Sequence, residues 1–191
     1  MTYVPLDPSD IVIVFADLQA GILERAATNE PSRIRLAVSA LAKVAKLFDI
    51  PVVVTTAPGE GGVAHVTPEI SAALGEQPQL MRNTTDAFLH GPTREAVLRT
   101  GRKTLLLAGV ATEIIVQHSA LSGAAHGLQV QVVIDACGGL SVRTEQAALG
   151  RLAQAGVIAT SVVSITGQLA GDFSQPKGGQ AIGILYETAS G

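Results

Sequence analysis

The stretch that decides the fold is residues 101–139, GRKTLLLAGVATEIIVQHSALSGAAHGLQVQVVIDACGG. Two short aliphatic runs, Thr104–Ala108 and Gln129–Ile134, flank a segment suited to a helix, Thr112–His126. Unbroken apolar runs of this length are typical of strands buried on both faces of a parallel sheet, and a helix can join two such strands. Residues 101–139 therefore predict a strand–helix–strand unit.

The same alternation continues on both sides of this unit. Further strands are expected at Ile11–Ala16, Val52–Val54, Pro78–Met81 and Val157–Thr160, and further helices at Arg33–Phe48, Pro92–Thr100 and Arg143–Gln154. Strands that alternate with helices favour right-handed crossovers and a mostly parallel sheet covered on both faces. The sequence thus predicts a doubly wound α/β fold, with residues 1–191 in a single domain.

Two features point to contacts between copies of the chain. Charged residues make up only 15% of the sequence, which is low for a monomer of this size and predicts a homo-oligomer. The tail, residues 175–191, shows no helical period, and its apolar run AIGILY at 181–186 could either add a strand or contact a neighbouring subunit. Both alternatives for the tail stay open.

Charge and hydropathy limit the partners. The net charge is −3 and the Lys and Arg residues are scattered, so neither nucleic acid nor a membrane surface is an expected partner. Residues 1–10 are polar with two prolines, unlike a signal peptide, and no apolar run has the length of a membrane span. We expect a cytoplasmic protein that binds a small-molecule ligand.

The sequence predicts no metal site and no cofactor. Cys137 is the single cysteine, and His65, His90, His118 and His126 lack the spacing of zinc ligands. No GxGxxG motif follows the first predicted strand, which argues against a dinucleotide-binding enzyme.

Chemistry is expected where predicted strands end, because ligands of open parallel sheets bind beyond the carboxyl ends of the strands. Asp17 directly follows the strand Ile11–Ala16; partial burial there would raise its pKa towards an acid or base role, although it could equally cap the turn. Thr112 can cap the following helix, whose amides at residues 113–115 would face the sheet edge and could bind an anion. Ile115, considered without its neighbours, is expected to be a residue of the hydrophobic core.

Five signals in the same order resemble one known family. They are Asp17 and Gln19 after the first strand, Arg82 six residues before Phe88, the segment Gly109–Val116, and Asp135-Ala136 at a strand end. This order is similar to that of the isochorismatase-like cysteine hydrolases, and residues 101–139 resemble the YcaC-like branch. The resemblance implies a six-stranded sheet in the order 3-2-1-4-5-6 and a cis peptide between Val110 and Ala111.

The resemblance also implies roles for individual residues. The family uses a triad of Asp, Lys and Cys, and Asp17, Arg82 and Ile115 occupy these positions. Arginine cannot shuttle a proton as lysine can, and isoleucine has no nucleophilic atom. Substrate contacts are expected at Gln19, Phe88, Ala111 and Thr112, and at His65 in the glycine-rich loop 57–67. Cys137, one strand farther from Asp17, is expected to be a buried structural residue.

Two functions remain open on the sequence alone. One is hydrolysis of a small molecule without a thiol, in which Asp17 acts as the acid or base. The other is a catalytically inactive binding or assembly protein that retains the fold of the family.

Overall fold

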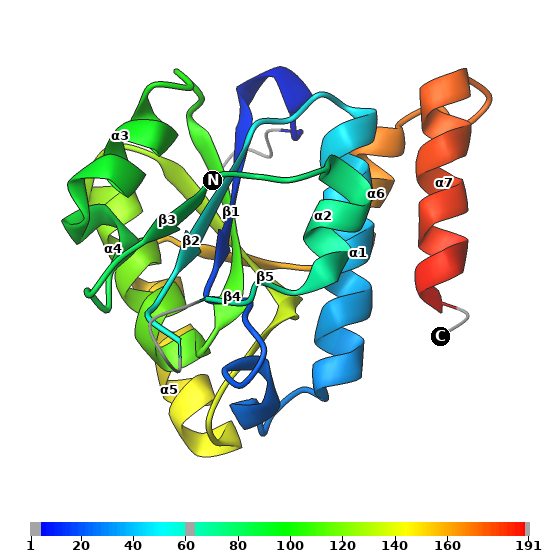
Figure 1. The fold of residues 1–191 in the computed structure, drawn as a ribbon. Helices are drawn as coiled ribbons and strands as arrows, with labels where there is room; N and C mark the ends of the chain where they lie inside the picture. Colours follow the sequence, from blue (N-terminus) through cyan, green and yellow to red (C-terminus); the bar gives the residue numbers. More distant parts are fainter. Residues whose placement is uncertain (1–4, 60–63, 190–191) are drawn as a thin grey trace.

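A computed structural model describes residues 5–59 and 64–189 of the chain. The strands form one all-parallel sheet in the order β3-β2-β1-β4-β5-β6 (Figure 1). Their bounds are β1 Ile11–Ala16, β2 Val52–Thr56, β3 Gln79–Met81, β4 Thr104–Val110, β5 Gln129–Gly138 and β6 Ile158–Thr160. This order and the parallel pairing confirm the predicted doubly wound α/β fold.

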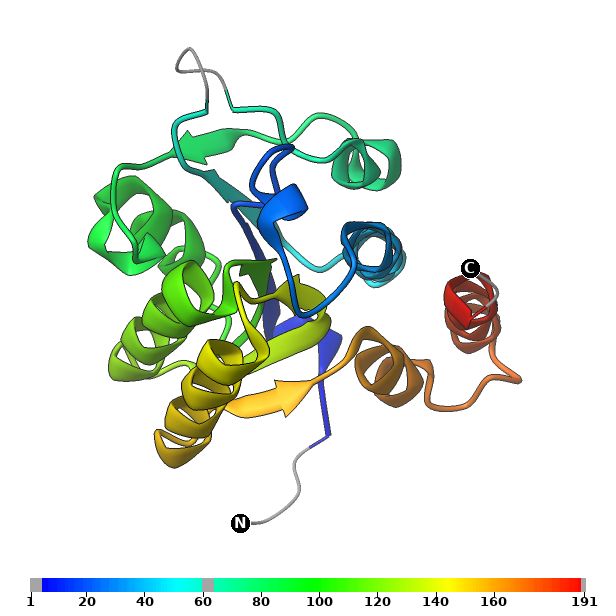
Figure 2. The same cartoon turned by 90° about the horizontal axis from the view of Figure 1, so that it is seen from below.

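Helices cover both faces of the sheet. Figure 2 shows α1, α2 and α6 on one side, with α7 outside them, and α3, α4 and α5 on the other. Their bounds are α1 Pro31–Leu47, α2 Pro68–Leu74, α3 Gly91–Leu98, α4 Gln117–Ala125, α5 Val142–Gln154, α6 Val162–Ala170 and α7 Pro176–Ala189. Short helical turns lie at η1 Pro8–Asp10, η2 Leu23–Arg25, η4 Ala87–Leu89 and η5 Thr112–Val116. No helix in the described ranges is long and apolar enough to cross a membrane.

Strand β1 divides the hydrophobic core into two layers. All of its residues are buried, and successive side chains of a strand point to opposite faces. Ile13 and Phe15 therefore pack towards α1 and α6, whereas Val12 and Val14 pack towards α4 and α5. Burial on both faces explains why the strand reads as a continuous aliphatic run.

Strands β1 and β4 approach each other closely where they end. Ala16 pairs with Gly109, and a Cβ atom added to Gly109 would lie 2.3 Å from the backbone oxygen of Ala16. Only glycine leaves room for this approach. Because both strands run in the same direction, the residues that follow them emerge side by side at one edge of the sheet.

The C-terminal segment differs from the sequence prediction. Residues 176–189 form the helix α7, which packs against α1 and α6, so the added strand considered for the AIGILY run is wrong. The buried positions of this helix include Gly178 and Ala181, and such small residues conceal a helical stripe in a hydropathy pattern. Figure 1 shows α7 at the flank of the molecule, beside α1.

Two other helical segments also differ from expectation. No element was predicted at Val162–Ala170, where α6 lies. The helix predicted at Thr112–His126 is divided, because it begins with the π-helical turn η5 and becomes α-helical only at Gln117.

The approach of β1 to β4 predicts the effect of a single methyl group. We expect Gly109→Ala to lower the free energy of unfolding by about 2 kcal/mol, because the added carbon meets backbone that cannot move aside cheaply. The measurement is urea unfolding followed by circular dichroism. Gly150→Ala in α5 is the matched control, since nothing lies within 4 Å of the added carbon, and it should raise stability by about 0.5 kcal/mol. Equal stability of the Gly109 variant and the wild type would contradict the close approach.

Candidate active site

A cavity of about 470 Å³ opens at the carboxyl ends of the central strands. The residue that follows each of four neighbouring strands lines it: Asp17 after β1, Ala57 after β2, Arg82 after β3 and Ala111 after β4. This is the edge at which open parallel sheets bind ligands. The fold therefore gathers at one place residues that are far apart in the sequence.

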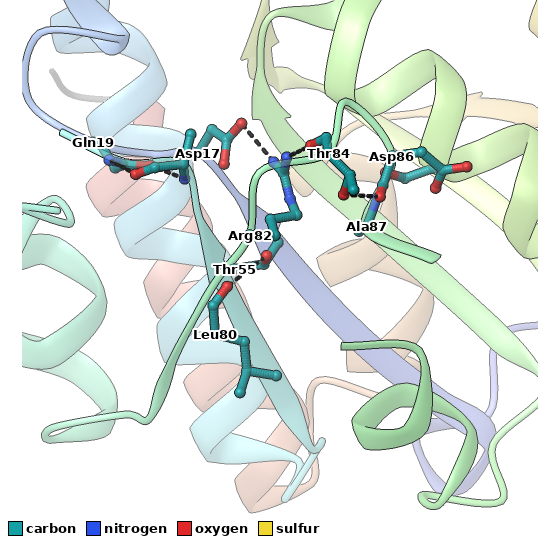
Figure 3. A network of polar contacts seen from close by, with 10 residues as sticks. Asp17, Gln19, Thr55, Leu80, Arg82, Thr84, Asp86 and Ala87 are labelled. Carbon is teal, nitrogen blue, oxygen red and sulfur yellow. Dashed lines mark hydrogen bonds and ion pairs between the residues drawn. The ribbon is translucent and has the colours of Figure 1, made fainter. Parts of the chain in front are cut away.

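Asp17 and Arg82 form a buried ion pair in this cavity. Arg82 Nη2 donates a hydrogen bond to Asp17 Oδ2 at 2.6 Å. Arg82 is only 3% exposed and Asp17 only 7% exposed. Figure 3 shows the guanidinium group of Arg82 between Asp17 and Thr84, whose backbone oxygen accepts a second hydrogen bond from Nη1. Thus the side chain of Arg82, the residue after β3, extends past β2 to the end of β1.

The pair leaves two polar atoms unused. Asp17 Oδ1 and Arg82 Nε are buried and have no hydrogen-bond partner within the described part of the chain. Asp17 has a φ of 54°, in the left-handed region that aspartate tolerates better than most residues. A buried acceptor without a partner costs free energy, so a donor from a bound molecule would be favoured at Oδ1.

Burial raises the pKa of the Asp17 carboxyl above its ordinary value, and the charge and hydrogen bond of Arg82 oppose this rise without cancelling it. Desolvation disfavours the charged carboxylate, whereas the nearby cation favours it. The net effect is a carboxyl that holds its proton more readily than one in water. That direction suits a general acid.

Ile115 lies in the same cavity as the ion pair. It comes from η5, is 1% exposed and also belongs to the hydrophobic cluster that packs against α4. The neighbouring Ile114 lines the cavity too and is partly exposed. Asp17, Arg82 and Ile115, which the sequence resemblance assigned to the triad positions, therefore line one cavity, and Ile115 forms an aliphatic part of its wall.

The start of η5 differs from the helix start predicted at Thr112. Ala111 is the N-cap residue, and Thr112 Oγ1 instead donates to Glu145 Oε1 at 2.7 Å. The amide of Ile114 donates to the oxygen of Ala111 at 3.1 Å, so it does not face the crevice as a free donor. The π-helical turn thus uses an amide that was expected to bind an anion. The cis peptide between Val110 and Ala111 is present, as the resemblance implied.

Glu113 connects this turn to the loop before α5 and to the first turn of α5. Its Oε1 accepts hydrogen bonds from the amide of Leu140 at 2.9 Å and from Thr144 Oγ1 at 2.7 Å. Burial alone would raise the pKa of Glu113, but these hydrogen bonds hold it below its ordinary value. The role of Glu113 shown by these contacts is to hold η5 in place.

Gln19 acts on the cavity through the backbone of Ala57. Its Nε2 donates to the oxygen of Ala57 at 3.0 Å, and its Oε1 accepts from the amide of the same residue at 2.8 Å. Gln19 is itself buried and does not line the cavity. It fixes the residue that forms the wall after β2.

The other expected contact residues are distributed differently. Ala111 lines the cavity, whereas Thr112 is not among the lining residues and its hydroxyl donates to Glu145. Phe88 is buried in the core and packs against the ring of His126, with ring centroids 5.4 Å apart. His65 lines a separate cavity of about 220 Å³ beside α2. Only the part of the loop 57–67 outside residues 60–63 lies within the described residues.

Several residues that line the cavity were not predicted from the sequence. Ile22 and Arg25, in the segment after β1, line the cavity, as do Asn83, Thr85 and Leu140. These residues lie in loops and turns without a periodic pattern. The available signal was their position in the segments that follow β1, β3 and β5.

Cys137 lies outside the cavity lining, in the hydrophobic cluster on the α4 side of the sheet. Burial raises the pKa of its thiol to about 12. A thiol in this state does not ionise near neutral pH and is a poor nucleophile.

Known proteins resemble the chain over most of its length. The family model described as Isochorismatase domain matches residues 11–164. The probable hydrolase YcaC of Escherichia coli is 37% identical over 155 residues, which are 81% of this chain and 74% of that protein.

Solved structures of YcaC proteins have the same fold as this chain. The YcaC gene product of Escherichia coli, described as an octameric hydrolase of unknown specificity, has a TM-score of 0.88 at 32% identity and covers 100% of this chain and 91% of its own. YcaC from Pseudomonas aeruginosa, solved with hexane-2,5-diol and covalent acrylamide, has a TM-score of 0.90 at 30% identity and covers 100% of this chain and 96% of its own. The sheet order, the cavity at the strand ends and these matches agree, and the chain belongs to the isochorismatase family, in its YcaC-like branch.

Proposed function

We propose that this hydrolase-like protein binds a small molecule in the cavity beside Asp17 and hydrolyses it without a thiol. The observation that carries the proposal is Asp17 itself: its carboxyl is buried, its pKa is raised, and Oδ1 has no partner in the described part of the chain. Such a group can give a proton to a bound molecule and take one back. Because Ile115 has no nucleophilic atom, a water molecule is the nucleophile.

The reaction balances with Asp17 and water alone. The protonated Asp17 donates its proton to the leaving oxygen or nitrogen while the bond from that atom to carbon breaks. The oxygen of a water molecule forms a bond to the same carbon, and the proton that the water loses returns to Asp17. Arg82, 2.6 Å away, stabilises the carboxylate that exists between these two proton transfers. No covalent intermediate with the protein forms.

A second candidate is a binding or assembly protein without turnover. Ile115 occupies space in the cavity wall, and the ion pair with Arg82 opposes the rise in the pKa of Asp17 that an acid role needs. Assembly is supported by exposed apolar side chains, among them Ile158 at 51% and Phe173 at 69% exposure. The octameric relative from Escherichia coli also supports a homo-oligomer.

The location of the protein in the cytoplasm stays a prediction.

Asp17→Asn tests the acid role. In a screen of amides, esters and vinyl ethers, we expect any hydrolysis by the wild type to fall about 100-fold or more in the variant, the usual contribution of a positioned acid. Asp49→Asn is the matched control, because Asp49 also has a positive φ, of 56°, but lies at the end of α1, away from the cavity. Full activity of the Asp17 variant would refute the acid role. A wild type that hydrolyses none of these compounds but still binds one would favour the second candidate.

The pH dependence gives a separate test. If protonated Asp17 is the active form, the rate falls as the pH rises through its pKa, which burial raises above 3.8. Arg82 lowers that pKa, so Arg82→Gln should move the fall in rate to higher pH, and Arg82→Lys should move it less. The measurement is the pH profile of kcat/KM. A shift to lower pH in the Gln variant would contradict the assignment of this limb to Asp17.

Ile115→Cys tests whether position 115 faces the cavity. We expect the folded wild type to remain unmodified by acrylamide, because Cys137 is buried and its pKa is about 12. The variant should gain one acrylamide group, since the new thiol lies in a cavity that a small reagent can enter. Intact-mass spectrometry measures the modification. The same reaction in denaturant, where Cys137 also reacts, is the control, and an unmodified folded variant would contradict the placement.

A further inference from the structure

The charges in the cavity do not cancel. Its lining holds three ionisable side chains, Asp17, Arg25 and Arg82, and the inner two neutralise each other as an ion pair. Arg25 is exposed, and within the described residues no carboxylate lies at ion-pairing distance from it; its neighbour Glu24 pairs with Arg35. Among the lining residues that the structure describes, one positive charge, that of Arg25, is therefore uncompensated when Asp17 is ionised.

The rest of the lining is mainly apolar. Ile22 and Leu140 come from the loops on either side, and Val110, Ile114 and Ile115 come from the end of β4 and from η5. Ligand cavities of this kind hold an apolar body and fix its orientation with a few polar groups. Here the ionisable groups outside β3 and its loop are Asp17 at the end of β1 and Arg25 in η2, and the segment after β3 adds the polar residues Arg82, Asn83, Thr84 and Thr85.

Asp17 Oδ1 and Arg25 bind different kinds of chemical group on a ligand. Oδ1 is an acceptor without a partner in a residue that is 7% exposed, so it requires an N–H or O–H donor. The guanidinium group of Arg25 has only donors and matches the two oxygens of a carboxylate. Arg25 is the one described cation of the lining outside the ion pair, so it matches one carboxylate on the ligand.

We infer that the ligand of this cavity is a small monocarboxylate with an apolar body and an amide or hydroxyl group at its other end. When Asp17 is ionised, its Oδ1 accepts a hydrogen bond from the amide or hydroxyl; when Asp17 is protonated, Oδ1 carries the proton that the proposed hydrolysis delivers to that same group. The carboxylate of the ligand binds Arg25 in both states. This inference rests on the proposed function, because it takes the same cavity as the site and adds the class of molecule. Arg25 is then the residue that determines specificity for charge.

Terephthalamate and terephthalamide test this assignment, since they have the same shape and differ only in whether one end is a carboxylate or an amide. We expect calorimetric titration of the full chain to show at least about tenfold tighter binding of terephthalamate, the worth of one modest ionic contact. Arg25→Gln should remove this preference, so that the two probes bind the variant with equal affinity. Arg33→Gln, at an exposed arginine of α1 outside the cavity lining, should behave as the wild type does.

The outcomes separate the two proposals. Equal affinity of the wild type for both probes, a preference that survives Arg25→Gln, or no binding of terephthalamate would each overturn the charge assignment, while the hydrolysis screen still tests the site. Ile115→Trp is added because its larger side chain fills the cavity. Binding of both probes that this variant leaves unchanged would place them elsewhere and overturn the proposed function as well.

Discussion

The close contact between β1 and β4 is the constraint on which the site depends. Ala16 and Gly109 are paired with no space for a side chain between them, so the chain leaves both strands at nearly the same point. Asp17 follows one strand and the segment leading to Ile115 follows the other. Their shared cavity is thus a consequence of backbone packing in the core, and the side chains that line it can change without altering this geometry.

The buried pair of Asp17 and Arg82 shows two opposing electrostatic effects. Burial of both groups removes them from water, which is costly, and the short contact between them offsets part of that cost. Because desolvation outweighs the effect of Arg82 on the pKa of Asp17, the carboxyl stays able to hold a proton.

The aliphatic runs predicted the strands well, because burial on both faces leaves a plain pattern in the sequence. The family resemblance, rather than periodicity, predicted the sheet order and the meeting of Asp17, Arg82 and Ile115. Helix α6 could have been predicted, since its buried residues 162, 165, 166, 169 and 170 have clear helical spacing. Helix α7 was concealed by its small buried residues, and the π-helical form of η5 and the position of Arg25 depend on tertiary contacts that no local pattern records.

Gln19 has a consequence for how selective the cavity can be. Its amide group satisfies both the donor and the acceptor of Ala57, as a neighbouring strand would, although β2 has already ended there. The exits of β1 and β2 are thereby coupled, and the wall between them is organised before any ligand arrives. A wall that does not adapt excludes molecules by shape, and it spares a fitting ligand the entropy loss of ordering a loop.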